Sequence, residues 1–96
     1  MKWLRSGLRR DICVVVASEG EPTAQQCKAA VESRYDDRID PKTFYGALDA
    51  LTETGHLTKT VDGLHDRYEL TAAGERALRD HYAWVDETLA DDAPAE

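Results

Sequence analysis

The segment DPKTFYG, residues 40–46, places several hydrogen-bond donors close together in the chain. A lysine such as Lys42 can bind a phosphate or a guanine, and the hydroxyls of Thr43 and Tyr45 can donate to phosphates or contact a thymine methyl group. Gly46 follows, and a glycine inside a helix lowers stability, so close approach of a DNA backbone is one reason for it. These residue types indicate contact with nucleic acid, and an ordinary solvated helix face is the alternative.

A helix is needed to present these donors, and the flanking residues predict one. Asp40 is a favourable N-cap, Pro41 is tolerated in a first turn, and Gly55 is a natural residue just beyond a C-terminus. Apolar residues recur at i, i+4 and i+7, which turns one face toward a core. They are Phe44, Leu48 and Leu51. The outward positions of the first turns are then Lys42, Thr43, Tyr45 and Gly46.

A β-hairpin is predicted directly after this helix. The segments 57–61 and 67–70 flank Asp62-Gly63, a dipeptide typical of tight hairpin turns. This hairpin carries Lys59, His65 and Arg67, and basic residues at such a place usually contact phosphates or reach a minor groove. Arg67 could instead pair with Asp66 or Glu69, and the sequence leaves both roles open.

The densest basic cluster lies near the N-terminus. It consists of Arg5, Arg9 and Arg10, for which we favour phosphate binding, with salt bridges to acidic groups of the same chain as the alternative. Lys28 lies on a second predicted helix and could contact the DNA backbone that this helix crosses.

The remaining signals complete the order α-α-α-β-β-α. Ser6 caps a first helix to about residue 18, Thr23 and Gln26 form a capping-box pattern for the second, and Thr71 opens the last. A short helix followed by a β-hairpin is typical of a winged helix. We therefore predict a mainly α fold with a small β-hairpin, a winged helix-turn-helix domain over residues 1–89 with a C-terminal dimerisation helix at about 71–89. Residues 90–96 are predicted to be a disordered acidic tail.

The last predicted helix carries an apolar stripe at coiled-coil-like spacing. The expected dimer-interface residues are Leu78, Tyr82, Trp84, Val85 and Leu89, together with Trp3, Leu4 and Leu8 from the other end of the chain. Two copies packed helix to helix would bury them and would set two recognition helices about 34 Å apart, the spacing of successive major grooves. Packing of the last helix onto the first helix of the same chain is the alternative.

The total charge opposes a simple electrostatic picture of DNA binding. The 96 residues include 12 Lys+Arg and 19 Asp+Glu, a net charge of −7, whereas DNA-binding domains are usually basic. Residues 1–35 carry six basic and four acidic side chains, residues 36–70 four and eight, and residues 71–96 two and seven. A basic DNA face on an acidic body is one arrangement that this distribution allows.

The excess of aspartate and the presence of only four lysines suggest a salt-loving organism. At about 1 M salt the Debye length is roughly 3 Å, so repulsion between the acidic body and a phosphate is screened. Counterion release would then yield little affinity. We expect acidic groups near the phosphates to share cations with the DNA, which would flatten or even reverse the salt dependence.

Cysteine and histidine chemistry finds little support in the sequence. Cys13 and Cys27 are interpreted as buried reduced thiols, because free cysteine commonly behaves as a small core residue, with redox sensing as the alternative. The three histidines, among them His65, lack metal-ligand spacing with these cysteines. His65 and Asp66, next to Asp62, could bind a metal on the hairpin, but we favour a solvated turn.

Enzymatic and membrane functions are not expected. No catalytic constellation, phosphate loop or nucleophile motif is recognisable, and no cofactor or metal is implied. Because the chain has neither an apolar run of about 18 residues nor the apolar core of a signal peptide, a cytoplasmic location without membrane binding is expected.

The stretch from Thr43 to Leu78, TFYGALDALTETGHL…DRYELTAAGERAL, resembles the PadR-like family of winged-helix transcriptional regulators, in a halophilic archaeal or archaeal-virus form. The blocks TFY-x-x-L-x-x-L-x-x-x-G-x-L and R-Y-x-L-T-x-x-G carry the resemblance, which extends over about residues 6–89. It implies homodimers that bind inverted-repeat operators, mainly as repressors. The single helix after the hairpin is similar to the family's compact members, and the extended C-terminal domain of its larger members is absent.

The sequence thus predicts a homodimeric, sequence-specific regulator that binds double-stranded DNA. The alternative is a winged-helix protein–protein interaction module without base readout, which the acidic total favours. A small-molecule effector is unknown, although a dimer cleft near Trp3 and Trp84 could hold one. The operator, the regulated genes, the signal and the direction of regulation are not encoded in any recognisable pattern.

Overall fold

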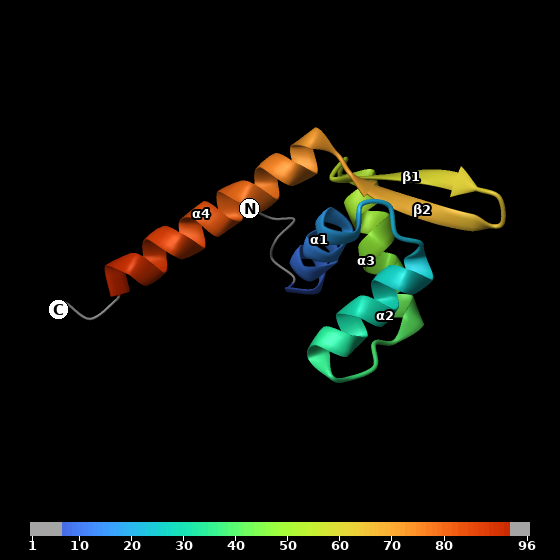
Figure 1. Ribbon diagram of the computed structural model, residues 1–96, viewed down its shortest axis with the longest axis horizontal. Coiled ribbons are helices and arrows are strands. Elements are labelled where there is room, and N and C mark those ends of the chain that lie inside the picture. The colour runs from blue at the N-terminus through green and yellow to red at the C-terminus, as the bar shows by residue number, and fades with distance from the viewer. Residues whose placement is uncertain (1–6, 93–96) are drawn as a thin grey trace.

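The computed structural model describes residues 7–92, and its elements follow the expected order (Figure 1). Helices α1 (Gly7–Glu19), α2 (Ala24–Tyr35) and α3 (Pro41–Glu53) precede strands β1 (Leu57–Asp62) and β2 (His65–Leu70), and α4 (Ala72–Asp92) follows. The two strands form one antiparallel hairpin. This is the α-α-α-β-β-α arrangement of a winged helix-turn-helix domain, so the predicted fold class is confirmed.

The predicted starts of α2 and α3 are confirmed by their caps. The Thr23 hydroxyl accepts the Gln26 amide at 3.1 Å while the Gln26 side chain accepts the Thr23 amide at 2.9 Å, a reciprocal capping box. The Asp40 carboxylate accepts the Thr43 amide at 3.1 Å. These bonds satisfy amides that the first turn of a helix cannot pair internally. Ser6, the expected cap of α1, lies outside the described residues.

The hairpin turn lies one residue further along the chain than predicted. Asp62 pairs with His65, so the two-residue loop is Gly63-Leu64 and not Asp62-Gly63. Gly63 has φ +65°, as a type II′ turn requires of its first central residue. Leu64 occupies the second central position, where its side chain is 98% exposed.

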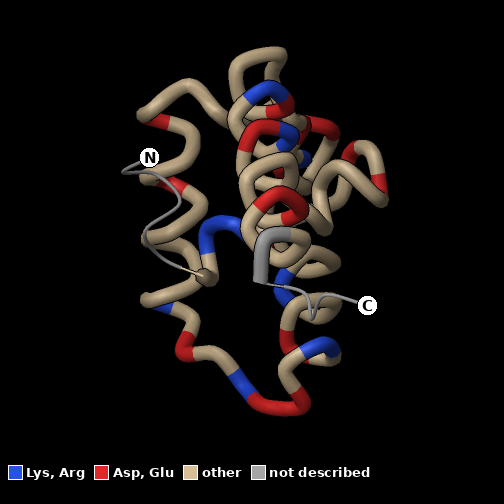
Figure 2. Tube along the Cα trace, turned by 90° about the vertical axis from the view of Figure 1, so that its left-hand side faces the viewer, with Lys and Arg blue, Asp and Glu red and all other residues tan. Residues whose placement is uncertain are grey.

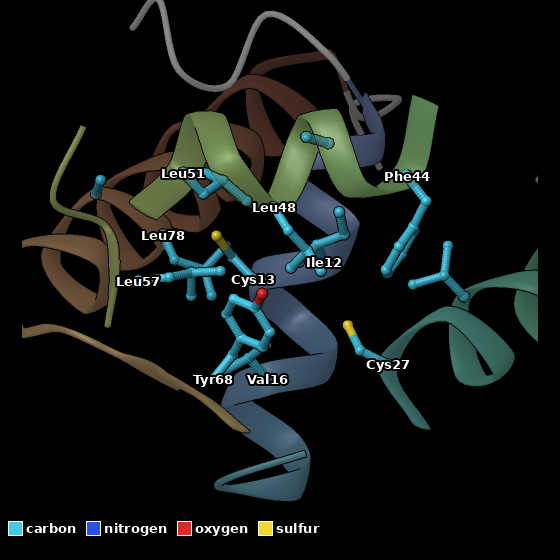
Figure 3. Packing of buried hydrophobic residues seen from close by; sticks show 13 residues of the cluster. Ile12, Cys13, Val16, Cys27, Phe44, Leu48, Leu51, Leu57, Tyr68 and Leu78 are labelled. Carbon is cyan, nitrogen blue, oxygen red and sulfur yellow. The ribbon is translucent and has the colours of Figure 1, made fainter. Parts of the chain in front are cut away.

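One hydrophobic core joins α1, α2 and α3 to the base of the hairpin and the start of α4 (Figure 3). Its largest fully buried apolar side chains are Ile12, Val16, Val31, Phe44, Leu48, Leu51 and Leu57. Cys13 and Cys27 are buried in the same core, and burial raises the pKa of each thiol to about 12. Because the thiolate is the reactive form, these cysteines pack as small apolar residues, and their burial argues against redox sensing.

Helix α4 extends away from the rest of the domain (Figure 1). Its first turns contribute Ala77 and Leu78 to the core, and the helix continues to Asp92, beyond the predicted end near Leu89. Residues 93–96 of the predicted tail lie outside the described part. None of the helices between residues 7 and 92 combines the length and the apolar composition needed to span a membrane.

Candidate nucleic-acid interface

The exposed side of α3 carries the four predicted DNA-contacting residues. Lys42, Thr43, Tyr45 and Gly46 are all exposed, as the apolar spacing predicted. The Tyr45 ring lies edge-on to the Phe44 ring, with centroids 5.8 Å apart and planes at 88°. Tyr45 therefore packs against a residue of the core. This contact restricts how the Tyr45 side chain can be directed.

The polar side chains at the start of α3 differ in the interactions that they form with the rest of the described chain. The Thr43 hydroxyl donates to the Asp40 carboxylate at 3.3 Å, close to the upper limit for such a bond. Lys42 forms no ion pair with any residue in the range 7–92. Its ammonium group is therefore available to an external anion.

A shallow hollow connects α3 to the hairpin tip and to the start of α2. Its volume is about 210 Å³. It is lined by Thr23, Ala24, Gln25, Tyr45, Leu64, His65 and Asp66. Three segments that are distant in sequence thus form one surface. In Figure 1 the hairpin tip and the start of α2 lie on the same side, away from α4.

Arg67 is engaged within the chain. Its Nε donates to the Asp62 carboxylate at 2.8 Å, and its Nη1 donates to the Glu21 carbonyl at 2.9 Å. The sequence had offered Asp66 or Glu69 as ion-pair partners, and that choice was wrong. Asp62 lies diagonally across the strand pair on the same face as Arg67, within reach of a long side chain. Arg67 therefore fastens the hairpin to the connection between α1 and α2.

The other titratable groups of the hairpin are more loosely held. The Lys59 ammonium lies 3.9 Å from the Asp66 carboxylate, the outer limit of an ion pair, and both side chains are half-exposed. His65 is exposed at the edge of the hollow. A phosphate contact by Lys59 would compete only with a weak, solvent-screened pair.

The N-terminal arginines lie at another place on the molecule. The Arg10 guanidinium is 3.3 Å from the Asp11 carboxylate, and the Tyr35 hydroxyl also donates to this carboxylate. Tyr35 is the last residue of α2, so Arg9 and Arg10 lie about one helix length from the hollow at the start of α2. Neither arginine lines that hollow. Arg5 lies outside the described residues.

Lys28 has an internal role that the sequence did not reveal. Its ammonium lies 2.7 Å from a Glu32 carboxylate oxygen, and the same oxygen accepts the Ile39 amide at 2.9 Å. The amide of Ile39, followed by the hydrogen bond from Lys28, lowers the pKa of Glu32 below its ordinary value. Lys28 thus helps to hold the connection between α2 and α3, and binding a phosphate would disturb that arrangement.

Positive and negative charge are mixed along the chain. Blue and red segments alternate along the described trace in Figure 2 and do not separate onto two sides in this view. Ion pairs contribute to this mixing, because they join basic residues to acidic neighbours within one helix, as Lys28 joins Glu32, or across the hairpin, as Arg67 joins Asp62.

The predicted dimer residues fall into two groups. Tyr82, Trp84 and Leu89 are 51%, 59% and 63% exposed on α4, and Val85 is half-buried. Leu78, in contrast, is buried in the core of its own chain, so its burial needs no partner. Leu8 is half-buried against the same core. Trp3 and Leu4 lie outside the described residues.

A second hollow, with a volume of about 460 Å³, lies between α4, α1 and the end of β2. It is lined by Val16, Ala17, Gly20, Glu69, Leu70, Glu75, Leu78, Arg79 and Tyr82.

Between residues 7 and 92, no three His, Cys, Asp or Glu side chains are grouped as metal ligands would be.

Solved structures share this architecture. RosR from H. salinarum is 24% identical with a TM-score of 0.76, over 91% of this chain and 92% of that one. A homodimeric winged helix-turn-helix DNA-binding domain from Mycobacterium bovis is 21% identical with a TM-score of 0.76, over 99% of this chain and 82% of that one. F93 from STIV, a winged-helix DNA-binding protein, is 16% identical with a TM-score of 0.71, over 85% and 89%.

These likenesses and the observed elements define a winged helix-turn-helix domain. At identities of 24% and below, they establish the fold alone. No protein-family model and no curated protein matches the sequence.

Proposed function

We propose that this protein is a sequence-specific DNA-binding transcriptional regulator that inserts α3 into a major groove. In a helix-turn-helix domain, the N-terminal part of the recognition helix contacts the base edges. At that place α3 exposes Lys42, Thr43, Tyr45 and Gly46. This exposed group, supported on a winged-helix core and bordered by the hairpin, is the observation on which the proposal rests.

Gly46 supports the proposal because packing within the chain does not account for it. A Cβ atom at this position would meet nothing within 4 Å. Glycine inside a helix lowers stability by roughly 0.5–1 kcal/mol relative to alanine. Gly74, in the first turn of α4, is in contrast accounted for by its close contact with the backbone of His56. A destabilising residue on an open surface is expected where another molecule approaches the helix backbone.

We propose further that two chains pair through α4. Tyr82 and Leu89 are exposed on one side of α4 and Trp84, 59% exposed, on another, and exposed large apolar side chains commonly mark an interface. The similar domain from Mycobacterium bovis is homodimeric. Two-fold pairing would present two copies of α3 to an inverted-repeat operator.

The proposed family and the proposed adaptation to high salt rest on the sequence. The motifs at residues 43–57 and 67–74 support a PadR-like repressor, and the net charge of −7 with only four lysines supports adaptation to high salt. Such a regulator acts in the cytoplasm on double-stranded DNA. The proposal includes no catalytic activity, and it leaves the effector unknown.

The experiment uses a duplex that the wild-type protein selects from a randomised pool. Lys42→Ala and Tyr45→Ala should each weaken binding to this duplex by about tenfold, the loss expected for a good base or phosphate contact. Arg76→Ala is a matched control, because Arg76 is another exposed cation without an ion pair among residues 7–92. Unchanged affinity in both α3 variants would show that α3 is not the reading helix.

A protein–protein interaction module is the second candidate. The net charge of −7 and the internal pairing of Arg67 favour it, because both weaken attraction to phosphates. Retention of the wild-type protein on random-sequence DNA separates the two functions. If the protein is not retained on random-sequence DNA at either low or molar KCl, the result contradicts DNA binding and favours the interaction module.

A further inference from the structure

We propose that the tip of the hairpin enters the minor groove of the DNA through Leu64, as an apolar contact and not an ionic one. This inference rests on the DNA binding proposed above. It assigns a DNA contact to a residue that the sequence pattern did not single out, and it replaces the phosphate contact considered for Arg67.

The exposure of Leu64 has no structural reason within the described chain. The side chain is 98% exposed, and Val61, before the turn, is 71% exposed. The type II′ turn requires the glycine at position 63 but makes no such demand on position 64. Leu64 buries almost no apolar surface within the chain, so a complex that covered its side chain would gain that burial.

The position of the tip connects it to the recognition surface. Leu64 and Tyr45 line the same hollow, together with residues at the start of α2. DNA that places a major groove on the exposed side of α3 would therefore bring an adjacent minor groove toward the hairpin tip. Leucine is among the apolar residues that proteins insert there, often between base steps.

The charges on the hairpin favour an apolar contact over a phosphate contact. Arg67 is held by the Asp62 carboxylate at 2.8 Å and by the Glu21 carbonyl, and Lys59 lies 3.9 Å from Asp66. The carboxylates of Asp62 and Asp66 flank the tip and would repel phosphates if their cations were withdrawn. The pairs leave the tip nearly neutral, with Leu64 as its most exposed apolar group.

An apolar contact has a measurable signature in salt titrations. Phosphate contacts release counterions, so each one steepens the fall of affinity with salt. Burial of a leucine releases none and is not screened. Removal of Leu64 should therefore lower affinity by a similar factor at every salt concentration, whereas removal of Lys42 should also make the salt dependence shallower.

The test compares Leu64→Ser with the conservative Leu64→Met on the duplex selected by the wild-type protein. The serine variant should bind about tenfold more weakly with an unchanged salt slope, and the methionine variant should retain most of the affinity. Hydroxyl-radical cleavage, which attacks the sugars through the minor groove, should show protection by the wild-type protein that the serine variant loses. Because the tip is exposed, thermal unfolding of both variants should match the wild type.

The experiment distinguishes a failure of the proposed DNA binding from a failure of the role proposed for Leu64. If the wild-type protein binds no duplex, the proposed function fails. If the wild-type protein binds and the serine variant binds equally well with the same cleavage pattern, only the role of Leu64 is overturned. Equal DNA binding together with a loss of self-association by Leu64→Ser would assign the tip to a second copy of the chain instead.

Discussion

Gly74 packs so closely against the carbonyl oxygen of His56 that a Cβ atom would overlap it. The same oxygen accepts the amide of Thr71 at 3.1 Å and its hydroxyl at 3.1 Å. The connection between α3 and β1 is thereby fixed to the start of α4. Through this contact, the orientation of α4 depends on the backbone at the end of α3.

Gly74→Ala should therefore destabilise the domain. Because the obstructing atom belongs to the backbone, it cannot rotate away as a side chain would, and the expected loss is about 1–3 kcal/mol of unfolding free energy. Urea unfolding followed by circular dichroism measures this loss. A variant as stable as the wild type would mean that α4 shifts freely at its start.

Gly46→Ala should have the opposite effect on stability. The added methyl group meets no atom within 4 Å, and alanine favours a helix, so stability should rise by roughly 0.5–1 kcal/mol. Binding to the selected duplex should nevertheless weaken, because the methyl group would obstruct the approach of DNA to α3. Gains in both stability and affinity would show that DNA does not approach this position.

Local sequence patterns predicted much of the fold. The capping box at Thr23, the cap at Asp40 and the apolar spacing from Phe44 depend on neighbouring residues, and each predicted its element correctly. Side-chain partners depend instead on strand register and on tertiary contacts. For this reason the partner of Arg67 was missed, and the turn was placed one residue early.

In the candidate site, too, the sequence predicted features that depend on neighbouring residues and missed those that depend on tertiary contacts. The exposure of Lys42 and Tyr45 on α3 follows from helical periodicity, and the sequence therefore predicted it. The separation of Arg10 from the hollow could not be predicted, because it depends on how α1 packs against the end of α2 near Tyr35. Lys28 was likewise assigned to DNA, since its bond to Glu32 is one of several arrangements that its spacing allows.

Acid should weaken the connection between α2 and α3 through Glu32. The Ile39 amide and Lys28 lower the pKa of this carboxyl below its usual 4.5 in the folded state. The folded state therefore binds the proton less tightly than the unfolded one. The stabilisation is present above pH 4.5 and is lost as the pH falls through the lowered value.

Glu32→Gln should remove this component of the acid sensitivity. The wild type should lose stability more steeply than the variant as the pH falls from about 7 to about 3, which urea titrations at several pH values would measure. Asp37→Asn is a control, because Asp37 is an exposed carboxylate in the same connection. Parallel pH profiles for the wild type and Glu32→Gln would contradict the assignment.

Salt should reduce DNA affinity less than the basic contacts imply. Each phosphate neutralised by a basic side chain normally adds about −0.9 to the slope of log affinity against log salt. Asp49 is exposed on α3 and Asp66 on the hairpin, so carboxylates lie near the proposed DNA position and can share cations with phosphates. Asp49→Asn should make the decline in calorimetric titrations with KCl steeper. A steep decline already present in the wild type would exclude shared cations.

Self-association should depend on the exposed residues of α4. Trp84 is 59% and Leu89 63% exposed in the single chain, and burial of aromatic residues commonly dominates an interface. Trp84→Ala should weaken dimerisation by at least about thirtyfold, equivalent to a hot-spot loss of about 2 kcal/mol. Light scattering in high salt would then give the mass of one chain where the wild type gives two. Arg76→Ala alters the same helix at an exposed charged residue outside the apolar stripe and should remain dimeric. A wild-type protein with the mass of a single chain would instead mean that α4 does not pair two copies, and that any operator is read one half-site at a time.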